Sequence, residues 1–234
     1  MSHPPVPVSS PSQLEPLQLQ STPEMIADRL RSEILDGRFS PDTQLSEVEI
    51  SRQLKVSRGP IREGMQRLIQ EGLLRAERNR GVFVVQLNAD DIRDVYLARA
   101  AVERAAASIV AEHQPAGALA TLQQIVDALS ASVGGAWGDL ISHDLSFHQA
   151  LVDAAGSRRL SRMFSTLSAE TRLCLMRLEP FYEHPAEVVA EHQAIVDALK
   201  AGDVQSVTGL IQAHMDASVA RLATQPVDVA DSSA

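Results

Sequence analysis

The sequence predicts a mainly α-helical protein, with a small N-terminal domain followed by an all-α antiparallel bundle of six to seven helices. Its 234 residues are 44% hydrophobic but only 3% aromatic, and Ala, Leu and Val dominate the C-terminal half, which favours helix packing over a β-sandwich. Apolar residues recur with a helical period from residue 90 to about 223. We expect a disordered tail at 1–20, domains at 21–87 and 88–223, and a frayed tail at 224–234.

The first two helices of the small domain are predicted from their N-terminal signals. Thr22 is expected to be the N-cap of the first helix, with Pro23 at its first helical position and Gly37 ending it. Ser46 lies three residues before Glu49, which is the spacing of a capping box and predicts a second, short helix.

A third helix and a hairpin complete the expected N-terminal domain. Ser57 is predicted to cap the third helix in the same way, and Pro60 lies in its first turn. Residues 73–77 and 82–85 have the composition of short strands, and the Arg-Asn-Arg-Gly segment at 78–81 is typical of a hairpin tip. Three helices followed by a basic-tipped hairpin make a winged helix-turn-helix.

The larger domain is predicted to consist of helices separated by Gly and Pro breaks. We place them at roughly 89–112, 115–133, 136–155, 157–178, 185–201 and 203–223.

Charge is distributed unevenly along the chain. The net charge is −9, but residues 52–80 contain eight Lys/Arg and three Glu, a balance of +5, whereas residues 88–234 have a balance of −9. This asymmetry suggests a basic binding surface carried by an acidic body, although a solvated charged helix face is the alternative.

Several absences point to a cytoplasmic protein that does not enter a membrane. No run of about 18 apolar residues is present. The N-terminus lacks the basic start and apolar stretch of a secretory signal. The single cysteine, Cys174, cannot form an internal disulfide, which fits a reducing compartment.

The segment from Leu45 to Leu74 carries a specific motif, Val-Ser-Arg-Gly-Pro-Ile-Arg-Glu at 56–63. It resembles the GntR family of bacterial regulators, and the resemblance extends over about residues 22–86. Gly59 stands where Thr is usual, and Gly64-Met65 replaces the commoner Ala-Leu. The resemblance implies binding to a double-stranded DNA operator.

The chemistry of the motif suits DNA recognition. Arg58 and Arg62 lie one turn apart at the start of the predicted recognition helix, where Arg can form two hydrogen bonds to guanine. Free N–H groups at the helix start suit a phosphate, and Arg80 with Gly81 could enter the minor groove. The alternative is that these are ordinary surface residues. The predicted DNA contacts are Arg52, Ser57, Arg58, Gly59, Arg62, Arg80 and Gly81, with Lys55 and Arg78 as weaker phosphate contacts.

Ionisable residues interrupt the apolar stripes of four helices in the larger domain. These residues are Arg99, the i,i+4 pair Asp144 and His148, His192, and His214. Buried ionisable groups need partners or a ligand. Three imidazoles and one carboxylate suit a divalent metal ion, with Zn²⁺ preferred and Ni²⁺ or Mn²⁺ as alternatives. The alternative is that these are core residues whose hydrogen bonds are made within the protein and that bind no ligand.

This arrangement also resembles the FCD domain, the effector domain of the FadR subgroup of GntR regulators, over about residues 90–222. The matching motifs are Asp-x-x-x-His at 144–148, Glu-His-x-x-Ile at 191–195, and His214. Ser157 stands where the family often has Asn. The resemblance implies that the metal is held by Asp144, His148, His192 and His214. It also implies that Arg99 anchors a small carboxylate effector. The alternative role for Arg99 is a buried salt bridge.

We therefore expect a homodimeric, ligand-responsive transcription regulator that reads a palindromic operator. One alternative is a metal-dependent hydrolase with Glu191 as a base, but four protein ligands leave fewer open positions than a catalytic zinc site has, and no HExxH motif is present. A second alternative is a regulator for which the metal itself is the signal.

Overall fold

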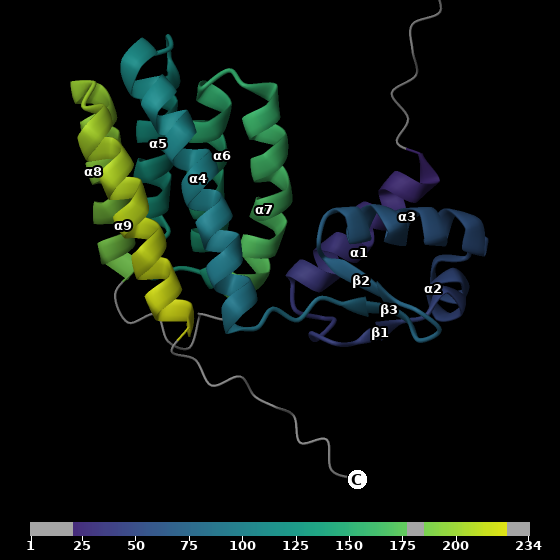
Figure 1. The fold of residues 1–234 in the computed structure, drawn as a ribbon. Coiled ribbons are helices and arrows are strands. Elements are labelled where there is room, and N and C mark those ends of the chain that lie inside the picture. Colours follow the sequence, from purple (N-terminus) through teal and green to yellow (C-terminus); the bar gives the residue numbers. More distant parts are fainter. Residues whose placement is uncertain (1–20, 177–184, 224–234) are drawn as a thin grey trace, which may run out of the picture.

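The protein forms a small domain of three helices and a three-stranded sheet, connected by one extended segment to a larger helical bundle (Figure 1). The structure is a computed structural model that describes residues 21–176 and 185–223. The tails expected at 1–20 and 224–234 lie outside these residues. The small domain contains α1 (Thr22–Leu35), β1 (Gln44–Leu45), α2 (Glu47–Leu54), α3 (Arg58–Gln70), β2 (Leu74–Glu77) and β3 (Gly81–Val84).

Helix α1 begins one residue earlier than the sequence signals indicated. Ser21, not Thr22, is the N-cap, and its hydroxyl accepts a hydrogen bond from the backbone N–H of Glu24 while the Glu24 carboxylate accepts one from the Ser21 N–H. Ser and Thr are both good caps, and the reciprocal Glu three residues on decides between them. The predicted apolar face is buried, as Ile26, Leu30 and Ile34 show.

A tight turn connects α2 to α3. Ser46 caps α2 as predicted, because its hydroxyl accepts a hydrogen bond from the Glu49 N–H, but the Glu49 carboxylate pairs with Arg52 instead of completing the expected capping box. Lys55 ends α2 in the left-handed conformation (φ 55°), and the Ser51 hydroxyl donates to the Val56 carbonyl at 2.7 Å. Ser57 is the N-cap of α3 by position, but its side chain makes no capping hydrogen bond, so the expectation of a capping box there was wrong.

The wing is an antiparallel sheet with strand order β1-β3-β2. Strands β2 and β3 form the predicted hairpin. Strand β1 was not predicted, because two residues carry no periodicity. It exists through pairing with β3, with Gln44 opposite Phe83 and Leu45 opposite Val82.

The larger domain contains six helices within the described residues, at boundaries close to those predicted. Helix α4 is central and packs against α9, α7, α6 and α8. None of the described helices combines the length and apolarity that a bilayer-spanning segment needs. The helices are α4 (Ala89–His113), α5 (Ala118–Ala131), α6 (Trp137–Ala154), α7 (Arg158–Met176), α8 (Pro185–Ala201) and α9 (Val204–Ala223).

Helix α7 forms the side of the bundle that faces the small domain (Figure 1). Its residues Ala169 and Leu173 pack against the core of the small domain. Glu170 lies against Gly72, just after α3, so closely that a Cβ added to Gly72 would come within 2.7 Å of the Glu170 carboxylate. The end of α3 is therefore in direct contact with the bundle.

Candidate DNA-reading surface and metal centre

The residues predicted to contact DNA are all exposed and lie on α2, the start of α3 and the tip of the wing. Burial of Ile61, Met65 and Leu68 against the core orients α3. This orientation turns Arg58 and Arg62 outward at the N-terminal end of the helix, where backbone N–H groups are also free.

Most arginines of this surface form ion pairs with nearby glutamates. Arg62 makes a bidentate pair with Glu47 of α2, at 3.0 and 2.9 Å. Arg52 is paired with Glu49 in the same way, and Arg80 is paired with Glu77. Arg58 forms no salt bridge within the described part of the chain, but it lies close enough to Glu47 to add to the lowering of that carboxyl's pKa, which Arg62 mainly causes. Exposed ion pairs contribute little to stability, so these arginines can exchange glutamate for phosphate or guanine.

The two glycines among the predicted DNA contacts, Gly59 and Gly81, have different surroundings. Gly81 has φ +114°, and a Cβ there would lie 2.7 Å from the side-chain nitrogen of Gln44, which donates to the Arg80 carbonyl at 2.6 Å. Glycine is thus required for the backbone path at the wing tip. A Cβ on Gly59 would meet nothing within 4 Å, so nothing in the fold requires glycine at that position.

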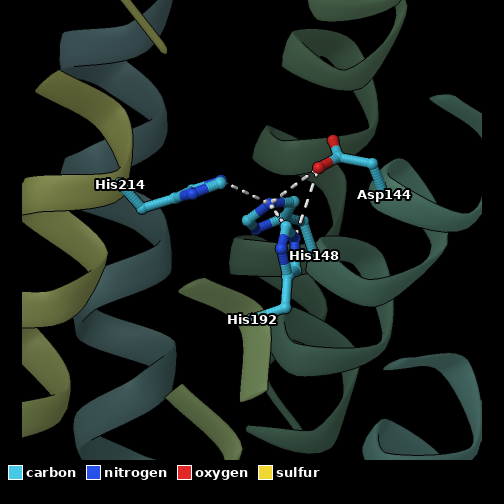
Figure 2. Close-up of side chains that lie close together, drawn as sticks. All are labelled: Asp144, His148, His192 and His214. Carbon is cyan, nitrogen blue, oxygen red and sulfur yellow. Dashed lines mark hydrogen bonds and ion pairs between the residues drawn. The ribbon is translucent and has the colours of Figure 1, made fainter. Parts of the chain in front are cut away.

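In the larger domain the four predicted metal ligands come together in the core (Figure 2). One ligand atom from each of Asp144, His148, His192 and His214 lies within 4.8 Å of all the others, and all four residues are buried. The Nε2 atom of His148 is 3.2 Å from that of His214 and 3.3 Å from that of His192. The Asp144 carboxylate lies 3.3 Å from His192 Nε2.

The opposite nitrogen of each imidazole faces a hydrogen-bond acceptor. His148 Nδ1 lies 2.5 Å from a Glu103 oxygen, and His214 Nδ1 lies 2.6 Å from a Glu191 oxygen. His192 Nδ1 donates to the Val188 carbonyl at 2.7 Å. These partners hold the proton of each neutral ring on Nδ1, so all three Nε2 lone pairs point inward.

Burial and neighbouring charges shift the pKa values around this centre. Burial lowers the pKa of His148, with the positive charge of Arg99 adding to the effect. Burial also lowers the pKa of His214, against the opposing influence of Glu191. Burial alone would raise the pKa of Asp144, and the hydrogen bond with His192 and the other two imidazoles lower it below its usual range when these rings also carry a proton on Nε2.

These donors fit a divalent cation. Three inward lone pairs and a carboxylate oxygen repel one another at separations of 3.2 Å to at most 4.8 Å, and a cation between them removes that repulsion. Ligands about 2.1 Å from one ion lie about 3.0–3.4 Å apart in octahedral or tetrahedral geometry, and the shortest separations here are 3.2–3.3 Å. The buried Asp/His cluster could therefore hold a metal ion.

Two carboxylates beside the centre were not predicted in their observed roles. Glu103 is fully buried and accepts from both His148 and Arg99. The sequence feature that could have predicted this role is the position of Glu103 four residues after Arg99, on the same helix face. Glu191, considered as a base, instead accepts from His214 and Arg221, at 2.6 and 2.7 Å. Burial opposes ionisation of Glu191, yet these two partners lower its pKa to about 2.

Arg99 is almost fully buried, and its Nε donates to Glu103 at 2.9 Å. The buried salt bridge considered as the alternative role is thus present. Burial would lower the pKa of Arg99, but the charge of Glu103 raises it. The salt bridge leaves the Nη2 atom of Arg99 without a hydrogen-bond partner among the described residues. Arg99 therefore retains a free donor.

Two known families match separate parts of the chain. Residues 22–84 match the family of bacterial regulatory proteins, gntR family, and residues 94–217 match the FCD domain. The chain is 26% identical over 192 residues to the HTH-type transcriptional regulator YdhC of Bacillus subtilis (strain 168), covering 81% of this chain and 85% of that protein. It is 26% identical over 193 residues to the gluconate operon transcriptional repressor of the same organism, covering 80% and 79%.

The fold is likewise that of a solved regulator. The structure aligns with a GntR transcriptional regulator from Rhodococcus sp. RHA1 with a TM-score of 0.75 and 29% identity, covering 88% of this chain and 100% of the other. These relatives are regulators and not enzymes, which argues against the hydrolase alternative. The chain belongs to the GntR family of bacterial regulatory proteins, as a transcriptional regulator with a C-terminal FCD domain.

Proposed function

We propose that this regulator belongs to the FadR subgroup and binds a palindromic operator as a homodimer, with its DNA affinity modulated by a small organic acid held near a divalent metal ion. The observation that carries this proposal is the convergence of three imidazole Nε2 atoms and the Asp144 carboxylate in a buried core. Such a regulator acts in the cytoplasm.

Asp144, His148, His192 and His214 would hold the ion, for which Zn²⁺ is the best candidate and Ni²⁺ or Mn²⁺ are alternatives. When bound, the ion supplies a Lewis-acidic position for an oxygen of the effector. Glu103, Glu191 and the Val188 carbonyl orient the imidazoles from outside. This support fixes the donor atoms before the ion arrives.

The effector carboxylate is proposed to bind between the metal centre and Arg99. Arg99 retains a free Nη2 donor, and Glu103 connects it directly to the metal-facing His148. An effector can change DNA affinity only if it binds two states of the protein unequally. The contact between α7 and the small domain, at Glu170 and Gly72, is a route by which a shift in the bundle could reach α3.

The DNA half of the proposal is tested by selection from a random duplex library. The wild type should enrich a short palindrome, and the double variant Arg58→Ala/Arg62→Ala should not. A matched control is Arg29→Ala/Arg38→Ala, which removes two exposed arginines of α1 and the turn after it, outside the predicted DNA contacts. If the wild type and the control protein both fail to enrich any sequence, with metal present or chelated, operator recognition is refuted.

The metal half is tested by thermal unfolding of chelator-treated protein with added Zn²⁺, Ni²⁺ or Mn²⁺. Binding to the native state raises Tm, by mass action. His148→Ala should abolish the increase, whereas the exposed His113→Ala should retain it. If metal alone changes operator affinity without any acid, the ion itself is the signal and the effector part of the proposal fails.

A further inference from the structure

An apolar cavity of about 170 Å³ lies where the small domain, the segment between β3 and α4, and the helical bundle meet. The small domain contributes the end of α1, the turn after it and the end of β3. The connecting segment contributes Val85 and Leu87, and the bundle contributes Ile92 of α4 together with the end of α7. Figure 1 shows this segment running from β3 to the start of α4. A ligand in this junction cavity would therefore contact both domains and their connection.

The junction cavity has a buried side and a side that faces solvent. On the buried side, Ile34, Val84 and Cys174 are at most 2% exposed. On the other side it is lined by Gly37 and by the turn that follows, which are exposed. The terminal methyl group of Met176 on α7 lies 3.9 Å from the position that a Cβ of Gly37 would occupy, so the two domains meet at this rim. A small molecule can enter from solvent along the exposed side.

The lining disfavours charged ligands. None of the described side chains that line the cavity is acidic or basic, and the polar ones are the Ser40 hydroxyl and the Cys174 thiol. Transfer of an unpaired charge into such surroundings is strongly unfavourable. Water gains little there as well, because a buried water molecule needs several polar partners. The lining therefore suits an uncharged, apolar molecule.

Size and composition favour a single aromatic ring. Apolar cavities of roughly 150 Å³ are known to bind benzene, so the volume here suits a six-membered ring with a small substituent. The lining also offers the ring of Phe39 and the sulfur atoms of Cys174 and Met176. Aromatic rings pack favourably against other rings and against sulfur. A saturated ring of the same size lacks these contacts.

We propose that the junction cavity is a second ligand site, which binds a small uncharged aromatic molecule and thereby changes operator affinity. Arg99 and the four expected metal ligands do not line it, so the site is separate from the proposed carboxylate site and requires neither the metal ion nor the organic acid. A ligand that contacts both domains binds one arrangement of them best, and unequal binding shifts the population of arrangements.

Binding is tested with fluorobenzene and the full chain by ¹⁹F NMR. The wild type should shift and broaden the fluorine resonance in a saturable manner, with or without a metal chelator. Excess toluene should displace the probe, whereas benzoate, which has the same ring and a negative charge, should not. Fluorocyclohexane should bind about two- to tenfold more weakly than fluorobenzene, because it lacks the aromatic contacts with sulfur.

Two variants place the probe in the cavity. Val85→Phe fills the cavity from the connecting segment and should abolish binding. Val133→Phe is the matched control, because it adds the same ring at an exposed position beyond α5, outside the cavity, and it should bind the probe as the wild type does. Met176→Leu keeps an apolar side chain but removes the sulfur atom. It should weaken fluorobenzene binding by about two- to tenfold and leave fluorocyclohexane binding unchanged, a result that does not depend on the folding of Val85→Phe.

The effect on DNA is measured by fluorescence anisotropy with the duplex that the wild type enriches. Saturating fluorobenzene should change the operator affinity of the wild type and of Val133→Phe by roughly fivefold or more. The affinity of Val85→Phe should not respond to the probe.

Several results would overturn the proposal. If the wild type has no saturable effect on the probe, the cavity takes up no aromatic ligand. Displacement by benzoate, or undiminished binding by folded Val85→Phe, would place the probe at another site. Equal binding of fluorocyclohexane would overturn the aromatic class, and binding without a change in operator affinity would overturn the regulatory role. The proposed carboxylate effector stands or falls separately, because it binds at the metal centre.

Discussion

Glu103 accepts a hydrogen bond from His148 Nδ1 at 2.5 Å with one carboxylate oxygen, and its other oxygen accepts from Arg99 Nε at 2.9 Å. All three side chains are buried. Burial raises the pKa of Glu103, although Arg99 opposes this effect. A single carboxylate thus fixes both the ring that faces the metal centre and the arginine proposed to hold the effector.

Glu103→Gln should weaken zinc binding by roughly 10–100-fold, the usual loss when a partner of a metal-bound histidine is changed. The amide has only one acceptor oxygen for two donors, so either His148 or Arg99 loses its partner. Competition with a chromophoric chelator measures the affinity. Glu112→Gln, at an exposed position of the same helix, should keep the wild-type affinity. Equal affinities for both variants would contradict a supporting role for Glu103.

The metal-free protein should lose stability as the pH falls below about 6.5. The lowered pKa values of His148 and His214 mean that the folded state binds fewer protons there than the unfolded state, whose imidazoles have the ordinary value of 6.5. The free energy of unfolding therefore decreases as pH falls through this region and is insensitive to these groups above it. The raised pKa of Glu103 acts in the opposite direction.

Denaturant unfolding at pH 5.5 and 7.5, with chelator present, measures this dependence. His148→Gln/His214→Gln should show a smaller loss between the two pH values than the wild type. His113→Gln, at an exposed position, serves as the control and should retain the full loss. If the double variant loses as much free energy of unfolding between pH 7.5 and 5.5 as the wild type, the pH dependence comes from other groups.

The sequence made the metal-facing residues recognisable because each interrupts an apolar stripe of helical period. Asp144, His148, His192 and His214 are therefore found by periodicity, and all prove to be buried. Glu103 lies on the same face as Arg99, but its role depends on α6 bringing His148 within reach. Such a contact between helices has no signature in either segment alone.

Sequence periodicity, caps and breaks predicted the helices well, but they did not predict contacts between elements. The six bundle helices follow from their breaks and periods, and the capping box at Ser21 was missed by one residue because Thr22 is an equally good cap by type. Strand β1 forms only because β3 lies beside it. The pairing of Arg62 with Glu47 likewise requires the turn that places α2 against α3.

Glu47→Gln should increase affinity for DNA and reduce discrimination between operator and random duplex. The Glu47 carboxylate neutralises Arg62 in the free protein and adds negative charge near the expected phosphates. Its removal frees Arg62 for any phosphate but also removes the contact that orients its guanidinium. Fluorescence anisotropy with both duplexes, across a salt series, measures the effect.

The control for this change is Glu33→Gln, which removes a carboxylate of α1 that pairs with Arg29 of the same helix and with Arg38 in the turn after it. It should leave both affinities near those of the wild type. A weaker affinity of Glu47→Gln for random duplex would show that Glu47 supports Arg62 rather than competing with DNA for it.

Gly64→Ala should destabilise the small domain, whereas Gly59→Ala in the same helix should not. A Cβ on Gly64 would lie 2.9 Å from a methyl group of Ile26 and 3.0 Å from the Pro23 carbonyl, so α1 and α3 would have to move apart. Overpacking of this kind costs about 1–3 kcal/mol, partly offset by about 1 kcal/mol of helix propensity. On Gly59 the added methyl meets nothing within 4 Å, so the propensity gain remains. Denaturant unfolding of the two variants should therefore shift in opposite directions, and a stabilised Gly64→Ala would mean that the crossing of α1 and α3 is looser than the structure shows.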